Sequence, residues 1–355
     1  MGGIESFALS ITENINKEKF DVDYLLATDS PHFYDNRVLE NGNRIFYTYR
    51  LLNLWKMIKY FFKMLQIFKT EKYDLIHTNM DFFNGVNILA AKISGCPRII
   101  CHSHNTSSAN GTGKESISVK IYHTIMRMMI NMADVRLGCS EEACRWMYGR
   151  KWRDKGCIVL HNAIDTDVRF NPCLYNREEL KIKYTLKRSL NILSIGRLCE
   201  QKNSLFLVEI AKQLQELGID FQLGIVGTGE KQFEIENKIK EYSLNENIVL
   251  YGKRTDIPEL LMAYDCFLFP SRWEGFGIAL IEAQYMSNIC FISDAIPPES
   301  NIGKCVTIPL NASARQWADT IIQRGSESLS LNEEAEKCTL PYFISQIENL
   351  YYYRL

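Results

Sequence analysis

Short apolar segments alternate with longer amphipathic segments along most of this chain. Near-continuous apolar runs are typical of parallel strands that are buried on both faces, and the segments between them are long enough for helices. The pattern predicts an α/β fold built on parallel sheets. The expected strands are residues 24–27, 75–77, 98–102, 135–138, 157–160, 192–195, 221–226, 248–251, 266–269, 289–292 and 305–308.

Eleven strands are too many for one ordinary doubly wound sheet. They separate at residues 162–189, a polar stretch that is rich in Asn, Asp, Lys and Arg and contains Pro172. The length of 355 residues also fits two domains at roughly 150 residues each. We therefore expect two Rossmann-like, doubly wound domains, residues 1–165 and 166–339, that face each other across a cleft.

The start of the chain departs from this alternation. Gly2 and Gly3 precede a helical pattern over residues 4–15, and in a doubly wound domain a strand normally leads into such a helix. That strand would lie before Met1. Either the N-terminal domain has no first strand, or the recorded start lies inside the natural protein, and we expect the second.

Residues 51–69 form an unusually apolar segment with a basic face. The sequence LLNLWKMIKYFFKMLQIFK has 13 apolar residues among 19, while Lys56, Lys59 and Lys63 share one side of a helix. Residues 44–72 contain seven basic residues and one acid. Two interpretations remain open: a buried helix with a solvated lysine stripe, or a helix that rests on an anionic membrane surface.

The composition limits which binding partners and which cellular compartment are expected. There are 41 Lys and Arg against 42 Asp and Glu, and this net charge of -1 argues against nucleic acid as the main partner. The eleven cysteines include no Cys-x-x-Cys pair, and their odd number fits reduced thiols in a cytoplasm. The sequence has no signal-peptide pattern and no apolar run of about 18 residues, so we expect no membrane span.

The stretch with the most chemical information is residues 269–283, FPSRWEGFGIALIEA. A strand is expected to end here, a loop with Gly275 and Gly277 follows, and a helix begins. Amides at a helix start favour an anion, and glycines let a ligand approach the backbone. Glu274 in the loop and Glu282 in the helix can bind two parts of one ligand, since carboxylates hydrogen-bond sugar hydroxyls. The density of glycines and acids disfavours the alternative, an incidental solvent-facing helix start.

A second loop follows the strand expected at 192–195 and reads GRLCEQKN. Arg197 and Lys202 in this loop can both reach a diphosphate, Arg197 through its planar guanidinium and Lys202 as a point charge. The alternative is a solvated surface pair. Gly227 and Gly229 follow the next strand and can pass close to a nucleotide, which is a weak signal on its own.

A third candidate is residues 101–105, Cys-His-Ser-His-Asn, at the carboxyl end of a strand, where open α/β sheets place ligands. His102 and His104 share one face if the strand stays extended that far. Three interpretations remain open: a metal pair, a polar catalytic contact from His104, or structural hydrogen bonds. A metal site has little support, because no nearby Asp, Glu or Cys completes a ligand set.

Taken together, these motifs resemble the retaining GT-B glycosyltransferases of family 4, also called group 1, and in particular bacterial members that build capsule and exopolysaccharide. The resemblance covers nearly the whole chain. Its specific element is the Glu-x7-Glu motif of Glu274 and Glu282 with the flanking Pro-Ser and Glu-Gly-Phe-Gly. The supporting matches are the opening glycine loop at 2–5, the histidine segment at 103–105, the donor-phosphate segment at 196–203, and an Asn-Gly-Ile-Asp-like segment at 161–165 in which Ala163 replaces glycine.

The resemblance implies a role for each matching residue. It implies that Arg197 and Lys202 hold the diphosphate of a nucleotide-sugar donor and that Glu282 binds its ribose. No metal or other cofactor is implied, and a final helix at 340–355 is expected to cross back to the N-terminal domain. The other residues implied at the donor sugar, the base pocket or the phosphates are Glu274, His104, Gly275, Phe276, Gly277, Lys253, Arg254, Gly2, Gly3, Gly227 and Gly229.

The leading hypothesis is an enzyme that transfers a sugar from a nucleotide donor to a lipid-linked glycan with retention of configuration. UDP is the first choice of donor base on family frequency, and GDP is the second. Residues 51–69 would hold the N-terminal domain against the cytoplasmic membrane face. The alternatives are a UDP-sugar epimerase, for which only His104 and Glu274 are acid/base candidates, and a catalytically silent partner subunit.

Overall fold

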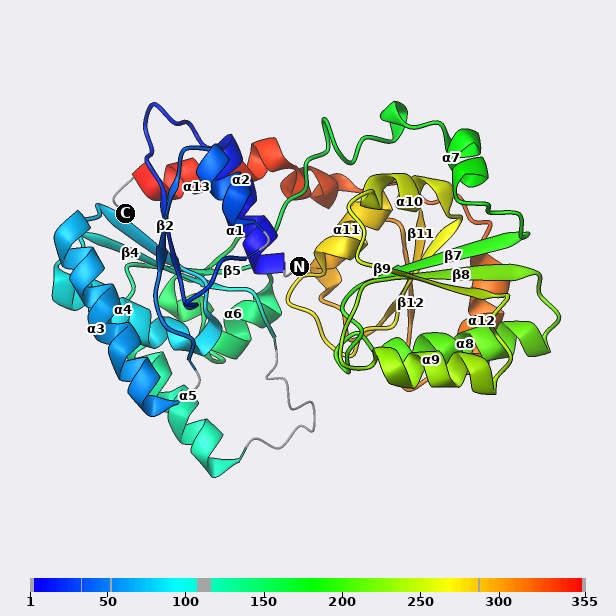
Figure 1. Cartoon of the computed structure of the whole chain (residues 1–355), viewed down its shortest axis with the longest axis horizontal. Coiled ribbons are helices and arrows are strands. Elements are labelled where there is room, and N and C mark those ends of the chain that lie inside the picture. The colour runs from blue at the N-terminus through cyan, green and yellow to red at the C-terminus, as the bar shows by residue number, and fades with distance from the viewer. Residues whose placement is uncertain (1–2, 33, 52, 107–115, 287, 353–355) are drawn as a thin grey trace. The chain divides into compact units, whose positions relative to one another are not determined.

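The computed structural model describes residues 3–32, 34–51, 53–106, 116–286 and 288–352 (Figure 1). The chain forms two compact units: Met1–Asn162 with Leu340–Leu355, and Ala163–Thr339. Every pairing between the described strands is parallel, as the apolar pattern predicts. The chain therefore leaves the first unit once and returns to it in the last helix.

The second unit is built on one six-stranded sheet in the order β12-β11-β10-β7-β8-β9. All residues of β10 and β11 are buried, because helices cover both faces of the sheet: α8, α9 and α12 on one, α7, α10 and α11 on the other (Figure 1). The strands are β7 (Leu190–Ile195), β8 (Phe221–Val226), β9 (Ile248–Gly252), β10 (Cys266–Phe269), β11 (Ile289–Ser293) and β12 (Cys305–Ile308). The helices are α7 (Arg177–Lys183), α8 (Ser204–Glu216), α9 (Gln232–Glu241), α10 (Ile257–Ala263), α11 (Ile278–Tyr285) and α12 (Ala314–Arg324), with short 3-10 helices at Pro172–Leu174, Pro298–Ser300 and Glu333–Cys338.

The strand order of this sheet reverses between β7 and β10. From β7 the chain proceeds outward through β8 and β9, and from β10 it proceeds outward the other way through β11 and β12. The connections that leave the carboxyl ends of β7 and β10 therefore diverge, which opens a crevice at the point where α/β sheets bind ligands. Residues 196–203 and 270–277 are these two connections.

The described residues of the first unit form two separate sheets, one of four strands in the order β3-β4-β5-β6 and one of two strands, β1-β2. The apolar pattern does not predict β2, a four-residue strand that starts with the exposed Arg44 and pairs with β1 along its whole length. The strands are β1 (Asp23–Leu26), β2 (Arg44–Tyr47), β3 (Leu75–Thr78), β4 (Arg98–Ser103), β5 (Val135–Gly138) and β6 (Ile158–Val159).

Two groups of helices pack together in the first unit. In one group, α4 packs against both α3 and α5. In the other, α1 packs on α13, and the ring centroids of Phe7 and Phe343 lie 5.4 Å apart. Helix α13 is also held by β4, where Arg98 Nε donates to the carbonyl of Leu350 at 3.0 Å. The helices are α1 (Gly3–Asn14), α2 (Asp35–Glu40), α3 (Leu54–Glu71), α4 (Asn84–Ser94), α5 (Ile117–Ile130), α6 (Glu141–Tyr148) and α13 (Leu340–Tyr352), with 3-10 turns η1 (Asp81–Phe83) and η2 (Arg153–Lys155). No helix among the described residues is both long enough and apolar enough to cross a membrane.

Candidate active site

The two connections at the reversal point lie side by side and are joined residue by residue. The amide of Arg272 donates to the carbonyl of Gln201 at 2.8 Å, and Gln201 Nε2 donates to the carbonyl of Trp273 at 3.1 Å. One residue further along both segments, Lys202 Nζ donates to Glu274 Oε1 at 2.6 Å. The two loops that the sequence analysis singled out separately therefore form one site.

The Lys202–Glu274 ion pair is the centre of this site. Glu274 is buried, and the ammonium of Lys202 also lies 4.6 Å from the centre of the Phe269 ring. A buried carboxylate requires a hydrogen-bonded cation, so the pair holds both side chains in place. It puts a cation, which suits a phosphate, and a carboxylate, which suits sugar hydroxyls, within one hydrogen bond of each other.

Arg197 differs from Lys202 in its environment. Arg197 is exposed, and its guanidinium makes no hydrogen bond or ion pair with the residues that the structure describes. Lys202 instead lies along the backbone of Gly196, where an added Cβ would come within 3.2 Å of the lysine side chain. One of the two predicted diphosphate ligands is thus open to solvent, and the other is engaged by the buried carboxylate.

Gly227 and Gly229 pack against the same connection. A Cβ at Gly227, whose φ is +136°, would lie 1.9 Å from the carbonyl oxygen of Gly196, and a Cβ at Gly229 would lie 2.2 Å from that of Leu198. The amide of Leu198 donates to the carbonyl of Thr228 at 3.1 Å. From the sequence alone, these glycines are expected to let a ligand come close to the backbone. The structure adds a packing requirement, because the two loops touch backbone to backbone.

The start of α11 closes the loop that carries Glu274. Gly277 is the N-cap residue, with φ +82°, and a Cβ there would come within 3.3 Å of the Phe269 ring. The side chain of Phe276 is buried, so this residue and its neighbour Gly275 can contact a ligand only through the backbone. The first amides of α11 have no intrahelical acceptor and suit an anion.

Glu282 lies in the second turn of α11. Burial raises the pKa of its carboxyl to about 7, and the positive charge of Arg169 opposes this rise. Desolvation disfavours the charged form of an acid, which explains the direction. The ionisation of Glu282 is therefore balanced near neutral pH, and a ligand that donates hydrogen bonds to it favours the ionised form.

Lys253 and Arg254 follow the carboxyl end of β9. Lys253 is exposed, whereas Arg254 is held by Asp256, with Nε donating to Oδ1 at 2.8 Å. The hydroxyl of Tyr184 donates to the same carboxylate at 2.7 Å. The Arg254 guanidinium lowers the pKa of Asp256 to about 2. Lys253 is thus available to a ligand, and Arg254 already has a structural partner.

His104 follows the last residue of β4 in the first unit. Its Nε2 lies 2.8 Å from Asn79 Oδ1, and because an amide oxygen only accepts, Nε2 carries the proton and Nδ1 keeps a lone pair. The ring of Phe7 contacts it at a centroid distance of 4.6 Å. Burial lowers the pKa of His104 to about 3, so the ring is neutral near pH 7. Asn79 was missed by the sequence analysis, although it directly follows β3 at the same sheet edge.

His102 shares the face of His104, with ring centroids 4.1 Å apart, as an extended strand predicts. It is fully buried, and its Nδ1 lies 3.2 Å from His77 Nε2. His77 Nδ1 in turn lies 2.8 Å from the hydroxyl of Tyr351 in α13. This network supports the structural interpretation for His102. Among the described residues, no group of three or more His, Cys, Asp or Glu side chains is arranged to hold a metal ion.

The two opening glycines have different outcomes. Gly2 lies outside the described residues. Gly3 is the first residue of α1, so the helix begins at the second glycine, one residue before its predicted start. The proposed contact of this helix start with phosphate stays a prediction.

Comparison with known proteins identifies the family. The sequence model described as "Glycosyltransferase Family 4" matches residues 1–168, and the one described as "Glycosyl transferases group 1" matches residues 176–336. The chain belongs to this glycosyltransferase family. The fold predicted from the sequence, GT-B with two Rossmann-like domains, is confirmed for this glycosyltransferase by solved structures.

Proteins similar in sequence to this glycosyltransferase are themselves named as glycosyltransferases. EpsF of Bacillus subtilis, a protein named as a glycosyltransferase, is 29% identical over 325 residues, which is 90% of this chain and 84% of EpsF. An Escherichia coli UDP-Gal:alpha-D-GlcNAc-diphosphoundecaprenol alpha-1,3-galactosyltransferase is 31% identical over 233 residues, 63% of this chain and 58% of that protein. The structure of Anabaena HepE in complex with UDP-glucose superposes with a TM-score of 0.78 at 17% identity, over 99% of this chain and 96% of HepE.

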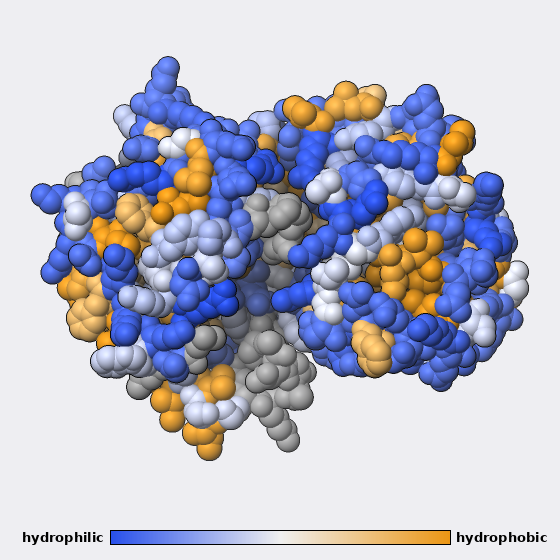
Figure 2. Space-filling view, viewed as in Figure 1, coloured by the Kyte–Doolittle hydropathy of each residue, from blue (hydrophilic) through white to orange (hydrophobic). Residues whose placement is uncertain are grey.

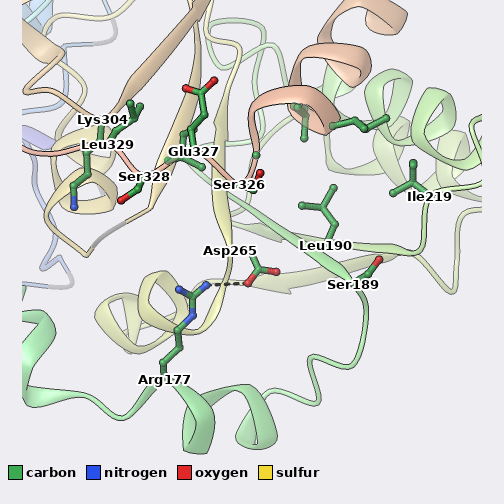
Figure 3. Close-up of a pocket in the computed structure, with 14 residues that line it drawn as sticks. Arg177, Ser189, Leu190, Ile219, Asp265, Lys304, Ser326, Glu327, Ser328 and Leu329 are labelled. Carbon is green, nitrogen blue, oxygen red and sulfur yellow. Dashed lines mark hydrogen bonds and ion pairs between the residues drawn. The ribbon is translucent and has the colours of Figure 1, made fainter.

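The glycosyltransferase also has a cavity of about 670 Å³ that does not belong to this site. Its lining residues include Ser189, Leu190, Asp265 and Lys304, which lie at the amino ends of the strands of the second unit (Figure 3). Arg177 spans part of its wall through an ion pair with Asp265 at 2.9 Å. Ligands of open α/β sheets bind at the opposite, carboxyl edge, so we assign the cavity no catalytic role.

Proposed function

We propose that this glycosyltransferase transfers a sugar from a UDP-sugar to a lipid-linked glycan, with retention of the anomeric configuration, in the synthesis of a bacterial surface polysaccharide. The observation that carries the proposal is the buried Lys202–Glu274 pair at the reversal point of the donor-side sheet. The choice of UDP is supported by the E. coli relative, which is named for a UDP-Gal donor, and by HepE, which was solved with UDP and with UDP-glucose.

In this proposal each part of the donor has its own contacts. Arg197 and Lys202 hold the diphosphate together with the first amides of α11. Glu274 and the backbone of residues 275–277 hold the sugar, and Glu282 accepts hydrogen bonds from the ribose hydroxyls. His104, which presents an unprotonated Nδ1, accepts from a hydroxyl of the donor sugar.

The bond that breaks joins the anomeric carbon to the phosphate oxygen, so the nucleoside diphosphate gains negative charge. Fixed cations and helix-start amides stabilise that charge where it develops. We propose that they suffice without a metal ion. The acceptor hydroxyl attacks from the face that the diphosphate leaves, and the departing phosphate takes its proton. Retention then needs no carboxylate nucleophile.

The acceptor is proposed to be lipid-linked and the enzyme to lie on the inner face of the cell membrane. The E. coli relative and a Campylobacter jejuni N-acetylgalactosaminyltransferase are both named for undecaprenol-linked acceptors. In α3, Trp55 and Phe62 are 64% and 62% exposed, on the same helix as Lys59 and Lys63. Exposed aromatic residues among lysines favour the interpretation of α3 as a helix on an anionic membrane surface.

The test is a calorimetric titration of the full chain with UDP, GDP, ADP and dTDP in the presence of EDTA. Saturable binding of UDP is expected, and the variant Glu282→Ala should bind it more weakly. Absence of binding by the folded protein would instead indicate a catalytically silent homologue. Once a donor that is turned over is known, NMR of the glycoside product, compared with the anomeric configuration of the donor, decides between retention and inversion.

A further inference from the structure

Helix α5 is apolar on two opposite faces. One face is buried in the first unit through His123, Met126 and Ile130. The other is exposed, and we call its large apolar residues the α5 stripe. Its members, between 39% and 78% exposed, are Ile117, Ile121, Ile125, Met128 and the following Met132. Figure 2 shows hydrophobic side chains at the surface over this helix.

The spacing of the α5 stripe is helical throughout. At about 100° per residue, its five positions fall within an arc of about 80°. A helix that covers a sheet needs only one apolar face, and the buried side of α5 already provides it. The exposed stripe is thus a second apolar surface that the fold of this unit does not use. Contiguous exposed apolar surface marks an interaction site.

The charged side chains of α5 itself, Lys120 and Arg127, are both basic. Helix α5 contains no acidic residue, and Lys120 is exposed beside the stripe. The first unit as a whole has 22 Lys and Arg against 17 Asp and Glu, whereas the second has 19 against 25. A basic surface with an exposed apolar stripe suits an anionic lipid bilayer, because both the headgroups and the acyl region then find partners.

The position of α5 relates this surface to α3. Helix α4 packs against both α3 and α5, so the three helices form one layer. In a parallel α/β sheet each helix runs back against its strands, so α3 and α5 both begin at the carboxyl edge of the sheet. His104 follows β4 at that same edge. The exposed Trp55 lies at the start of α3, as Ile117 and Ile121 do at the start of α5.

We propose that the α5 stripe inserts into the same anionic membrane as α3, so that two helices hold the first unit on the bilayer. One amphipathic helix leaves the protein free to turn about the helix axis, whereas two helices in one layer fix its orientation. The edge that carries His104 then stays close to the headgroups, where the diphosphate of a lipid-linked acceptor lies. This inference rests on the proposed membrane-bound acceptor.

The test is co-sedimentation of the full chain with vesicles of phosphatidylcholine and phosphatidylglycerol. The variants Ile121→Glu and Met128→Glu are expected to lower the fraction bound at least tenfold. Ile322→Glu, at a 40% exposed isoleucine of α12 in the second unit, is the matched control and should bind like the parent. Melting temperatures of all variants should stay close to that of the parent, because these positions are exposed.

Two measurements keep the outcomes apart. Unchanged binding of Ile121→Glu and Met128→Glu would overturn the inference. It would also be overturned if light scattering without vesicles showed a dimeric parent and monomeric variants, because the α5 stripe would then be an interface between copies. Equal binding to vesicles of phosphatidylcholine alone would overturn the anionic partner. UDP titration of the same variants should match the parent, so a failure of the donor site and a failure of the α5 stripe give different results.

Discussion

Lys202 Nζ and Glu274 Oε1 lie 2.6 Å apart although 72 residues separate them in the chain. This distance is set by the pairing of β7 with β10, whose carboxyl ends deliver the two loops to one place. A diphosphate that binds Lys202 therefore has to compete with Glu274. A donor sugar whose hydroxyls bind Glu274 would compensate for the contact that the carboxylate loses.

The buried ion pair makes stability depend on Lys202. Lys202→Ala leaves Glu274 buried without its cation, and we expect it to lower the free energy of unfolding by about 2–4 kcal/mol. Urea denaturation measures this change. The double variant with Glu274→Gln should be less destabilised than the sum of the single variants. Arg315→Ala in α12, which breaks an exposed pair with Asp319, is the control and should cost less than about 1 kcal/mol.

Arg197 should behave in the opposite way. Because Arg197 is exposed and has no partner among the described residues, Arg197→Ala should leave the urea midpoint unchanged. Its proposed contact is with charge that develops as the donor bond breaks, so kcat should fall by about 10²–10³. Steady-state kinetics with the donor identified by titration measures this. Parent-like turnover would remove Arg197 from the site.

Glu282 should give UDP binding a pH dependence near neutrality. Its pKa of about 7 means that the carboxyl is protonated below pH 7 and ionised above it. If the ionised form accepts the ribose hydroxyls, affinity should fall about tenfold between pH 8 and pH 6. Calorimetry at both values measures the change. Glu282→Gln should bind more weakly at pH 8 and lose most of the pH dependence. A parent whose affinity is constant over this range would contradict the role.

Asn79 is expected to select the tautomer of His104, a ring that burial keeps neutral. Burial lowers the pKa of His104 to about 3, so ionisation of His104 should not appear in the pH profile of kcat between pH 6 and 8. Asn79→Asp places a carboxylate beside Nε2 and should raise that pKa, since a nearby negative charge favours imidazolium. Activity of this variant should therefore fall as the pH is lowered. Asn79→Ala should reduce kcat without adding a new pH-dependent step, which separates the charge effect from lost packing.

Gly227 should tolerate no side chain. A Cβ at this position would overlap the carbonyl oxygen of Gly196 at 1.9 Å, so Gly227→Ala forces two loops apart in addition to its backbone strain. We expect a loss of at least about 2 kcal/mol in urea denaturation. Gly218→Ala is the control: its φ is also positive, at +72°, but a Cβ there meets nothing within 4 Å. It should cost about 1 kcal/mol. An equal loss of unfolding free energy in the two variants would show that the loops move apart at little energetic cost.

The sequence determined most of the secondary structure and the chemistry of the loops. The strand expected at 266–269 is β10 with the same bounds. It was easy to predict because a strand that is buried on both faces has an apolar residue at every position. The helix expected at 51–69 is α3, displaced by a few residues. The Glu-x7-Glu motif and the basic loop at 196–203 could be identified from the sequence, because local spacing decides which residues follow a strand and begin a helix. The donor, the retention of configuration and the roles of the site residues stay predictions.

The tertiary structure decided what depends on partners distant in the chain. Strand β2 forms because β1 lies beside it, and its own four residues carry too weak a pattern. The pairing of Gln201 and Lys202 with residues 272–274, the tautomer that Asn79 imposes on His104 and the overlap at Gly227 all arise between segments brought together by strand order. Periodicity records which face of an element is buried. It does not record the neighbour that buries that face. Only the structure shows that one apolar face of α5 is buried in the first unit and that the other is exposed.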